Sequence, residues 1–151
     1  MQDNVLRGST GHALVRAFRL INRRFGAAAK HFGISAEQVH ILLTLWSEGP
    51  MTVGALQRAV SLSGPTLTGA LQRLEEGGQV RRVRDEQDRR AWRVEAIPWD
   101  ARRRGRLVEV MRAEEDACFA TLTATERRQL HELLSRLVRR LDEEEAATPR
   151  R

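Results

Sequence analysis

Arginine side chains are concentrated in the middle of this chain, where their guanidinium groups could bind phosphate. Between Gly54 and Arg106, twelve arginines stand against seven acidic residues, so most of the net charge of +6 lies in this stretch. Guanidinium groups make bidentate contacts to phosphate oxygens and to guanine. All basic residues except Lys30 are arginine; genome composition could produce that choice, so the clustering is the stronger signal. The pattern predicts double-stranded DNA as a partner.

A short helix within this stretch, from about Pro65 to Glu76, would present DNA-binding side chains on one face. Its N-terminus has two plausible caps, Gly64 followed by Pro65 at the first helical position, or Ser63. The apolar residues are spaced to form one buried stripe, which consists of Leu67, Ala70, Leu71 and Leu74. The exposed face would then consist of Pro65, Thr66, Thr68, Gly69, Gln72 and Arg73.

Each residue type on this exposed face suits duplex DNA. The threonine hydroxyls can donate to phosphate or touch bases, and the glutamine amide can pair with adenine. Gly69 lets the backbone come close to the duplex. Arg73, almost three turns into the helix, is better placed to hold a phosphate. We therefore expect this segment to be the recognition helix that enters the major groove.

The segment that follows changes its hydrophobic period from 3.6 to 2, which predicts strands at 79–84 and 91–97 joined by a polar tip at 85–90. Arg89 and Arg90 would lie at this tip, where the negative potential of a minor groove attracts arginine. Asp88 would repel DNA by itself, so we interpret it as a buttress that orients Arg90. The strand arginines are expected to add contacts to the DNA backbone; they are Arg81, Arg82, Arg84 and Arg93.

Helices must position these residues, and their ends are marked in the sequence. A long amphipathic helix runs from Leu14 to Phe32 and stops at Gly33. A capping box of Ser35 and Gln38 opens the next helix, which ends at Gly49-Pro50. An extended stretch at 51–53, a helix at 54–60 and a turn at 61–63 then lead to the recognition helix. The order predicts a mainly α fold with a small β-hairpin wing, a winged helix-turn-helix from about Met51 to Ile97.

Two further helices after Pro98 carry apolar stripes too long for a chain of this size to bury alone. The first stripe comprises Leu107, Val108, Met111, Cys118, Phe119 and Leu122. After a capping box of Thr123 and Glu126, the second comprises Leu130, Leu133, Leu134, Leu137, Val138 and Leu141. An isologous homodimer would bury them, although an intrachain bundle is the alternative. We expect residues 1–34 and 98–147 to form a helical dimerisation region and residues 35–97 the DNA-binding domain.

Five motifs together resemble the MarR family of bacterial regulators over nearly the whole chain. They are Ile34-Ser35-Ala36-Glu37-Gln38, Gly49-Pro50-Met51-Thr52-Val53 with Leu56, Thr66-Leu67-Thr68, Arg73-Leu74-Glu75-Glu76 and Asp85-Glu86-Gln87-Asp88-Arg89-Arg90. The resemblance implies a dimer held by the first and last two helices. It also implies binding to a pseudo-palindromic operator, usually as a repressor that a small molecule or oxidant releases.

The chain departs from that family at two places. Gly77-Gly78-Gln79-Val80 stands where the family commonly has Lys-Gly-Leu-Val, which changes little. Ile97-Pro98-Trp99-Asp100 stands where Thr-x-x-Gly commonly opens the fifth helix. That segment is the hinge between wing and dimerisation helix, so its structure cannot be carried over from the family.

A small aromatic or phenolic effector is the ligand that the resemblance implies, between the dimerisation helices and the DNA-binding unit. Arg16, His40 and Trp46 are candidate lining residues, and ordinary core and surface roles are the alternative. Cys118, the single cysteine, falls on an apolar stripe, which favours an inert thiol over a redox switch. The four histidines are scattered, so we predict neither a metal site nor a cofactor.

Several classes of protein are disfavoured by the sequence. It has no glycine-rich phosphate loop, nucleophile elbow or metal-spaced carboxylate pair, so we do not expect an enzyme. No apolar run approaches the length of a membrane span and the first residues lack the order of a signal peptide, which together predict a cytoplasmic protein. An architectural DNA-binding protein without operator preference and a protein-interaction module remain as alternatives.

Overall fold

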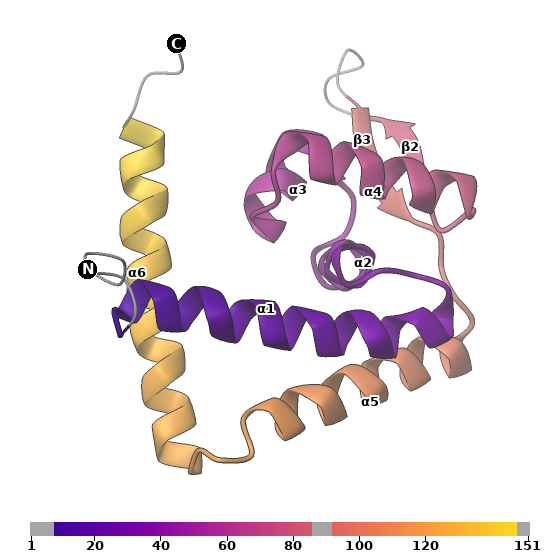
Figure 1. Cartoon of the computed structure of the whole chain (residues 1–151). Coiled ribbons are helices and arrows are strands. Elements are labelled where there is room, and N and C mark those ends of the chain that lie inside the picture. Colours follow the sequence, from indigo (N-terminus) through magenta and orange to yellow (C-terminus); the bar gives the residue numbers. More distant parts are fainter. Residues whose placement is uncertain (1–7, 86–91, 148–151) are drawn as a thin grey trace, which may run out of the picture. The chain divides into compact units, whose positions relative to one another are not determined.

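The computed structural model describes residues 8–85 and 92–147 and consists of helices around a small three-stranded sheet (Figure 1). This confirms the predicted fold class. The elements are α1 (Thr10–Ala29), the 3-10 turn η1 (Lys30–Phe32), α2 (Ala36–Glu48), β1 (Met51–Thr52), α3 (Val53–Val60), α4 (Gly64–Glu76), β2 (Val80–Arg84), β3 (Trp92–Ala96), α5 (Ala101–Cys118) and α6 (Ala124–Ala147). The chain divides into two compact units, Met1–Glu114 and Glu115–Arg151, which are described separately below. The division into a DNA-binding domain and a dimerisation region stays a prediction.

The helix ends of the first unit follow the local signals in the sequence. Gly33 has a φ of 74°, the left-handed conformation that glycine adopts without strain, and it ends the α1–η1 segment as expected. At the start of α2, the Ser35 hydroxyl accepts from the Gln38 amide while the Gln38 side chain accepts from the Ser35 amide. This is the predicted capping box, and it satisfies amide groups that the helix itself leaves unpaired.

Two details of the helix-turn-helix correct or complete the expectations. Val53, predicted to be extended, is instead the first residue of α3, because the Thr52 hydroxyl accepts from the Ala55 amide and caps the helix one residue earlier. Of the two plausible caps for α4 the structure has Ser63, whose hydroxyl accepts from the Thr66 amide. Gly64 is therefore already helical, and Pro65 follows in the first turn, where its missing N–H costs no hydrogen bond.

The core of the first unit is formed where α2 lies between α1 and α4 (Figure 1). Its largest fully buried side chains come from α2, α3, α4, β3 and α5, and they are Ile41, Leu42, Leu56, Leu67, Leu71, Leu74, Val94 and Leu107. At about 1.5–3 kcal/mol for each buried aliphatic side chain, this cluster is the main force that fixes α4 on the protein.

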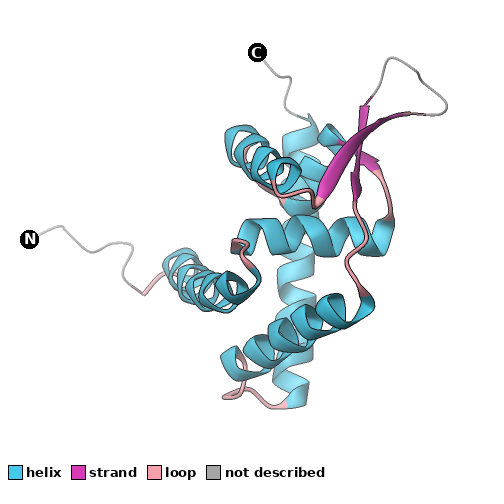
Figure 2. Ribbon diagram, turned by 90° about the vertical axis from the view of Figure 1, so that its right-hand side faces the viewer, coloured by secondary structure: helices cyan, strands magenta, loops and turns pink. Residues whose placement is uncertain are grey.

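The sheet has the strand order β1-β3-β2, with both pairs antiparallel, and β2 and β3 form the hairpin that Figure 2 shows in magenta. Val80 lies opposite Ala96, Arg82 opposite Val94 and Arg84 opposite Trp92. Residues directly opposite in an antiparallel pair project to the same side, and successive residues alternate. Because Val80 and Val94 are buried, this set of six residues occupies the side of the hairpin that packs on the core.

The unusual segment before α5 is anchored by Trp99 and Asp100. The Asp100 carboxylate accepts from the Arg103 amide at 2.9 Å, so aspartate caps α5. The Trp99 ring lies edge-on to Trp46 of α2, with ring centres 5.3 Å apart, and the Arg103 guanidinium lies 3.8 Å from the centre of the Trp99 ring. A tryptophan thus packs the hinge against the winged unit.

In the second unit α6 begins with the predicted capping box, in which the Glu126 carboxylate accepts from the Thr123 amide at 2.8 Å. α5 ends at Cys118, so Phe119 and Leu122 follow the helix instead of extending its stripe. None of the residues of α6, all of them described, is buried. No helix in the described ranges combines the length and apolar character that crossing a bilayer requires.

Candidate nucleic-acid interface

The recognition helix α4 has the two faces that the sequence predicts. All four stripe residues are buried, with at most 1% of each exposed: Leu67, Ala70, Leu71 and Leu74. The candidate DNA-contacting side chains on the other face are exposed, namely Pro65, Thr66, Thr68, Gln72 and Arg73, and Gly69 is half-buried. α4 therefore lies fixed on the core by one face and offers polar groups from the other.

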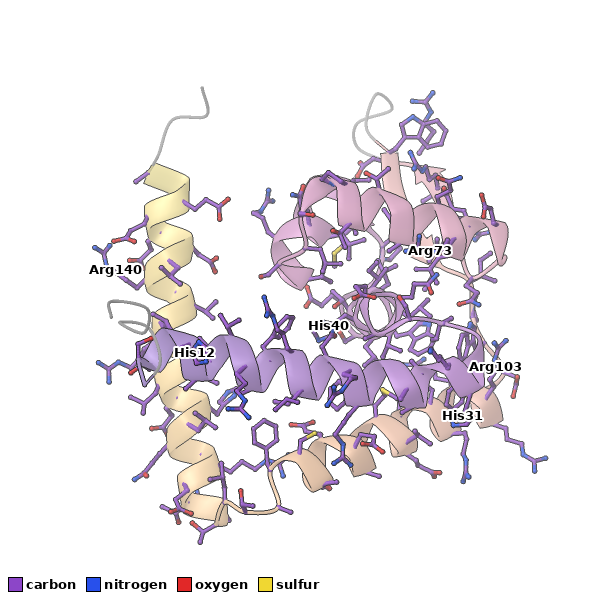
Figure 3. All side chains as sticks on the ribbon, viewed as in Figure 1. His12, His31, His40, Arg73, Arg103 and Arg140 are labelled. Carbon is purple, nitrogen blue, oxygen red and sulfur yellow. The ribbon has the colours of Figure 1, made fainter. Side chains whose placement is uncertain are left out.

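Short-range contacts already organise part of this face. The Thr66 and Ser63 hydroxyl oxygens lie 2.7 Å apart, and the Gln72 side-chain amide donates to the Glu76 carboxylate at 2.9 Å. The Arg73 guanidinium folds back along the helix, so that a Cβ built on Gly69 would lie 3.6 Å from Arg73 Nη1 (Figure 3 labels Arg73). Gln72 would have to exchange its bond to Glu76 for a base, whereas the Thr68 side chain has no hydrogen bond to break among the described residues.

Arg73 and Glu37 of α2 line the same hollow. The pKa of Glu37 lies below its ordinary value, chiefly because its carboxylate accepts from its own backbone amide, then because of hydrogen bonds from Ser35 and Asn22 and the nearby charge of Arg73. Partial burial opposes this shift. The carboxylate of Glu37 therefore stays ionised to lower pH than an ordinary glutamate.

Arg81, Arg82 and Arg93 form ion pairs with described residues. Arg81 pairs with Glu95 at 2.8 Å, and Arg82 pairs with Glu75 of α4 at 2.9 Å. Arg93 pairs with Asp85 at 3.2 Å and also donates to the carbonyl oxygen of Pro50. These pairs were not foreseen from the sequence, and each must be exchanged or shared before the arginine can contact a DNA phosphate. They hold the hairpin to α4 and to the start of β1.

The fourth strand arginine, Arg84, has a different partner. Its guanidinium carbon lies 4.0 Å from the centre of the Trp92 ring, in a cation–π contact. From the sequence, Trp92 is predicted only to be a strand residue. Aligning the two predicted strands about the tip at 85–90 would place Arg84 opposite Ala91, so the pairing with Trp92 depends on the strand register that the structure shows.

The tip residues Asp88, Arg89 and Arg90 lie outside the described residues. The proposed buttress of Arg90 by Asp88 therefore stays a prediction. The described residues that flank the tip, Arg84 and Trp92, belong to a paired hairpin, which is the element that a wing requires.

The three candidate effector residues lie in three different environments. Arg16 is exposed on α1 and lines a shallow hollow with neighbours from the same helix, including His12 and Val15. His40 is exposed on α2 (Figure 3), and Trp46 packs against Trp99. The hollow beside Arg16 contains neither of the other two. Their role in ligand binding stays a prediction.

The described histidines do not assemble a metal site. Figure 3 shows His12, His31 and His40 at separate places along α1, η1 and α2. Within the part of the chain that the structure describes, no three side chains of histidine, cysteine, aspartate or glutamate are grouped closely enough to hold a metal ion.

Comparisons with known proteins agree with this geometry. Residues 34–92 match the family model described as the MarR family. The chain is 30% identical to the HTH-type transcriptional regulator PecS of Dickeya dadantii over 131 residues, which covers 85% of this chain and 79% of that protein. In two other curated HTH-type regulators the matched region spans only 38% and 57% of the protein's length.

Two solved structures extend the similarity to the fold. A MarR family transcriptional regulator from Silicibacter pomeroyi is 27% identical, with a TM-score of 0.71, and the match covers 87% of this chain and 88% of that one. A structure of overoxidized AbfR bound to DNA is 28% identical, with a TM-score of 0.64 and coverage of 85% and 89%. Sequence, helix order and hairpin therefore agree over most of the chain, and this protein belongs to the MarR family of winged helix-turn-helix transcriptional regulators.

Proposed function

We propose that this protein is a sequence-specific DNA-binding regulator that binds a pseudo-palindromic operator as a homodimer. One observation carries the proposal: α4 exposes a row of threonine, glutamine and arginine side chains while four apolar residues fix its other face to the core. A rigid helix of this kind can present base-reading groups to the major groove. The similarity to a structure of AbfR in complex with DNA supports the same role.

The exposed apolar side chains support the dimer. On α1 they include Leu14, Val15, Phe18 and Leu20, and Phe18 is 63% exposed. On α6 they are Leu133, Leu137, Val138 and Leu141, all between 43% and 58% exposed. Rows of exposed apolar side chains on a helix are costly in water, and an isologous interface with a second copy of the chain would bury them. A two-fold axis would place the two copies of α4 about 34 Å apart, one turn of the duplex.

Repression and its release form the finer part of the proposal. Occupation of an operator would exclude other proteins from the promoter, and a small aromatic or phenolic ligand or an oxidant would release the regulator, as the family resemblance implies. Cys118 is the only cysteine of the chain and is half-buried. If thiol oxidation is the trigger, Cys118→Ser will abolish release from DNA by peroxide; unchanged release by peroxide in that variant excludes the thiol route.

Fluorescence anisotropy with two duplexes tests sequence-specific binding. The first duplex carries a palindrome from the region upstream of the gene, and the second carries the same bases in scrambled order. We expect the palindrome to bind more tightly at every salt concentration, with both affinities falling as salt rises. Equal affinity for the two duplexes would refute operator recognition and favour an architectural DNA-binding protein; no affinity for either would favour a protein-interaction module.

A matched pair of variants then locates the interface. Thr68→Ala removes an exposed hydroxyl from α4, and Arg112→Ala removes an exposed charge from α5. The first should reduce the preference for the palindrome by about 1–3 kcal/mol if Thr68 contacts a base, while the second should leave the preference unchanged. If Arg112→Ala reduces the preference and Thr68→Ala does not, α4 is not the element that reads the bases.

Sedimentation at micromolar concentration tests the dimer. The wild-type protein should sediment as a dimer, and Leu137→Glu should shift it toward the monomer because a carboxylate in an apolar interface loses its hydration. Gln129→Glu introduces the same charge at an exposed polar position of α6 and serves as the control. A wild-type monomer would remove the basis for a palindromic operator.

A further inference from the structure

Trp92 is an exception among the large apolar side chains of this protein. Within residues 8–85 and 92–147, the exposed large apolar side chains lie on α1 and α6, apart from Trp92 on the hairpin, which is 45% exposed. Those on the two helices fit the proposed dimer, and Trp92 is not explained by it. An exposed tryptophan next to a wing tip that is expected to bind DNA therefore needs its own account.

The register of the hairpin fixes the side on which Trp92 lies. Trp92 and Arg84 are direct cross-strand partners, two residues beyond the pair formed by Val94 and Arg82. Val94 is buried and Arg82 pairs with Glu75, so this side of the hairpin faces α4. Side chains at every second position share a side. Trp92 and Arg84 consequently occupy the α4-facing side of the hairpin, beyond the edge of the core.

Their mutual geometry restricts the guanidinium. Arg84 has its guanidinium carbon 4.0 Å from the centre of the Trp92 ring, within the range at which the negative face of an indole attracts a cation. Stacking leaves the edge of the planar guanidinium, where its N–H donors lie, directed away from the ring. The stack restricts the Arg84 side chain before DNA arrives, which lowers the entropic cost of a contact.

We propose that Trp92 is a positioning residue of the DNA interface, which holds Arg84 in place to bind a phosphate of the duplex whose major groove α4 enters. The ligand is the sugar-phosphate backbone and not a base, since a guanidinium stacked on a strand residue outside the recognition helix contributes affinity without reading sequence. This inference rests on the proposed DNA-binding function and adds a residue that neither the recognition helix nor the wing tip includes.

A double-mutant cycle on a fluorescein-labelled duplex of random sequence tests the proposal. Arg84→Ala should weaken binding and reduce the slope of log affinity against log salt by about 0.9, the loss of one phosphate contact. Trp92→Ala should weaken binding about two- to five-fold, the range set by an exposed cation–π contact. The double variant should bind no more weakly than Arg84→Ala alone, because Trp92 acts only through Arg84.

Rescue separates positioning from a merely structural role. Trp92→Phe keeps an aromatic face for the guanidinium and should bind within about two-fold of wild type, because phenylalanine also attracts a cation. If the Trp92→Ala and Arg84→Ala losses multiply in the double variant, Trp92 contacts DNA independently and the positioning role is wrong. Wild-type affinity of Trp92→Ala, or a loss that Trp92→Phe does not restore, would equally overturn it.

Different measurements would refute the proposed function and the positioning role of Trp92. Operator recognition fails if the palindromic and scrambled duplexes bind equally to wild type, whatever the cycle shows. The positioning role fails on the coupling between Trp92 and Arg84, measured on a duplex without any operator. An unfolding curve in urea for each variant checks that an affinity loss does not come from a loss of folded protein.

Discussion

Gly69→Ala should make the protein more stable and a weaker DNA-binding protein at the same time. Gly69 lies inside α4, where alanine is favoured over glycine by about 0.8–1.0 kcal/mol. The nearest atom to an added Cβ is Arg73 Nη1 at 3.6 Å, an ordinary van der Waals contact with the end of a flexible side chain. Nothing in the free protein offsets the gain, so the free energy of unfolding should rise by about 1 kcal/mol.

The effect on DNA has the opposite sign because Gly69 lies on the exposed face of α4. If the helix backbone approaches the duplex at this residue, the added methyl group enters a packed contact, which typically costs about 1–3 kcal/mol. That cost corresponds to binding roughly five- to 150-fold weaker. Urea unfolding followed by circular dichroism measures the first effect, and fluorescence anisotropy with the palindromic duplex measures the second.

Gly105→Ala is the matched control. Gly105 lies inside α5, and a Cβ built there has no neighbour within 4 Å. It should raise stability by about the same 1 kcal/mol and leave DNA affinity unchanged. A Gly69→Ala protein that is stabilised yet binds the palindrome as wild type would refute a close approach of α4 to DNA at Gly69, and with it the placing of this face in the groove.

Three further outcomes are expected. Trp99→Ala should lower the free energy of unfolding by about 2 kcal/mol, the combined contribution of the Trp46 ring pair and the Arg103 cation–π contact. Trp99→Phe should lower it much less. Equal urea midpoints for wild type and Trp99→Ala would show that Trp99 does not anchor the hinge. The pKa of Glu37 is lowered in the folded state, so the stability that Glu37 contributes is present above its ordinary pKa of 4.5 and is lost as the pH falls through the lowered pKa. Glu37→Gln should therefore reduce the loss of unfolding free energy at acidic pH. An unchanged loss in that variant would contradict the pKa shift. Arg90→Ala should weaken operator binding strongly and Asp88→Ala nearly as much, measured by anisotropy; tighter binding by Asp88→Ala would show simple repulsion in place of a buttress.

The local features of this fold could be predicted because neighbouring residues in the chain determine them. The capping boxes of α2 and α6 each join residues three apart, so a serine or threonine followed by glutamine or glutamate is enough to identify them. The buried stripe of α4 follows from its 3.6-residue period in the same way. The choice between Ser63 and Gly64 as the cap of α4 was open, since both residue types favour that position and one hydroxyl hydrogen bond decides between them.

Partners distant in sequence could not be predicted. Whether an arginine of the hairpin pairs within the protein depends on strand register and on the packing of α4. Arg82 reaches Glu75 of α4, whereas Arg93 reaches Asp85, which follows β2, and the carbonyl of Pro50, which precedes β1. The aromatic contact at the hinge joins Trp46 of α2 and Trp99 before α5, which are far apart in the sequence. Neither the ion pairs nor the tryptophan contact follows a regular spacing that a single sequence reveals.

By itself, the sequence determined the order of the elements, the two faces of α4 and an excess of arginine suited to a polyanion, since period, capping and charge are properties of short segments. Tertiary structure decided that Arg81 pairs with Glu95 and Arg82 with Glu75, that Arg84 stacks on Trp92, and that an aspartate and a tryptophan form the hinge. The physical reason is the same in each case: charge and aromatic contacts act over a few ångströms, and only the folded core brings residues from separate elements to that distance.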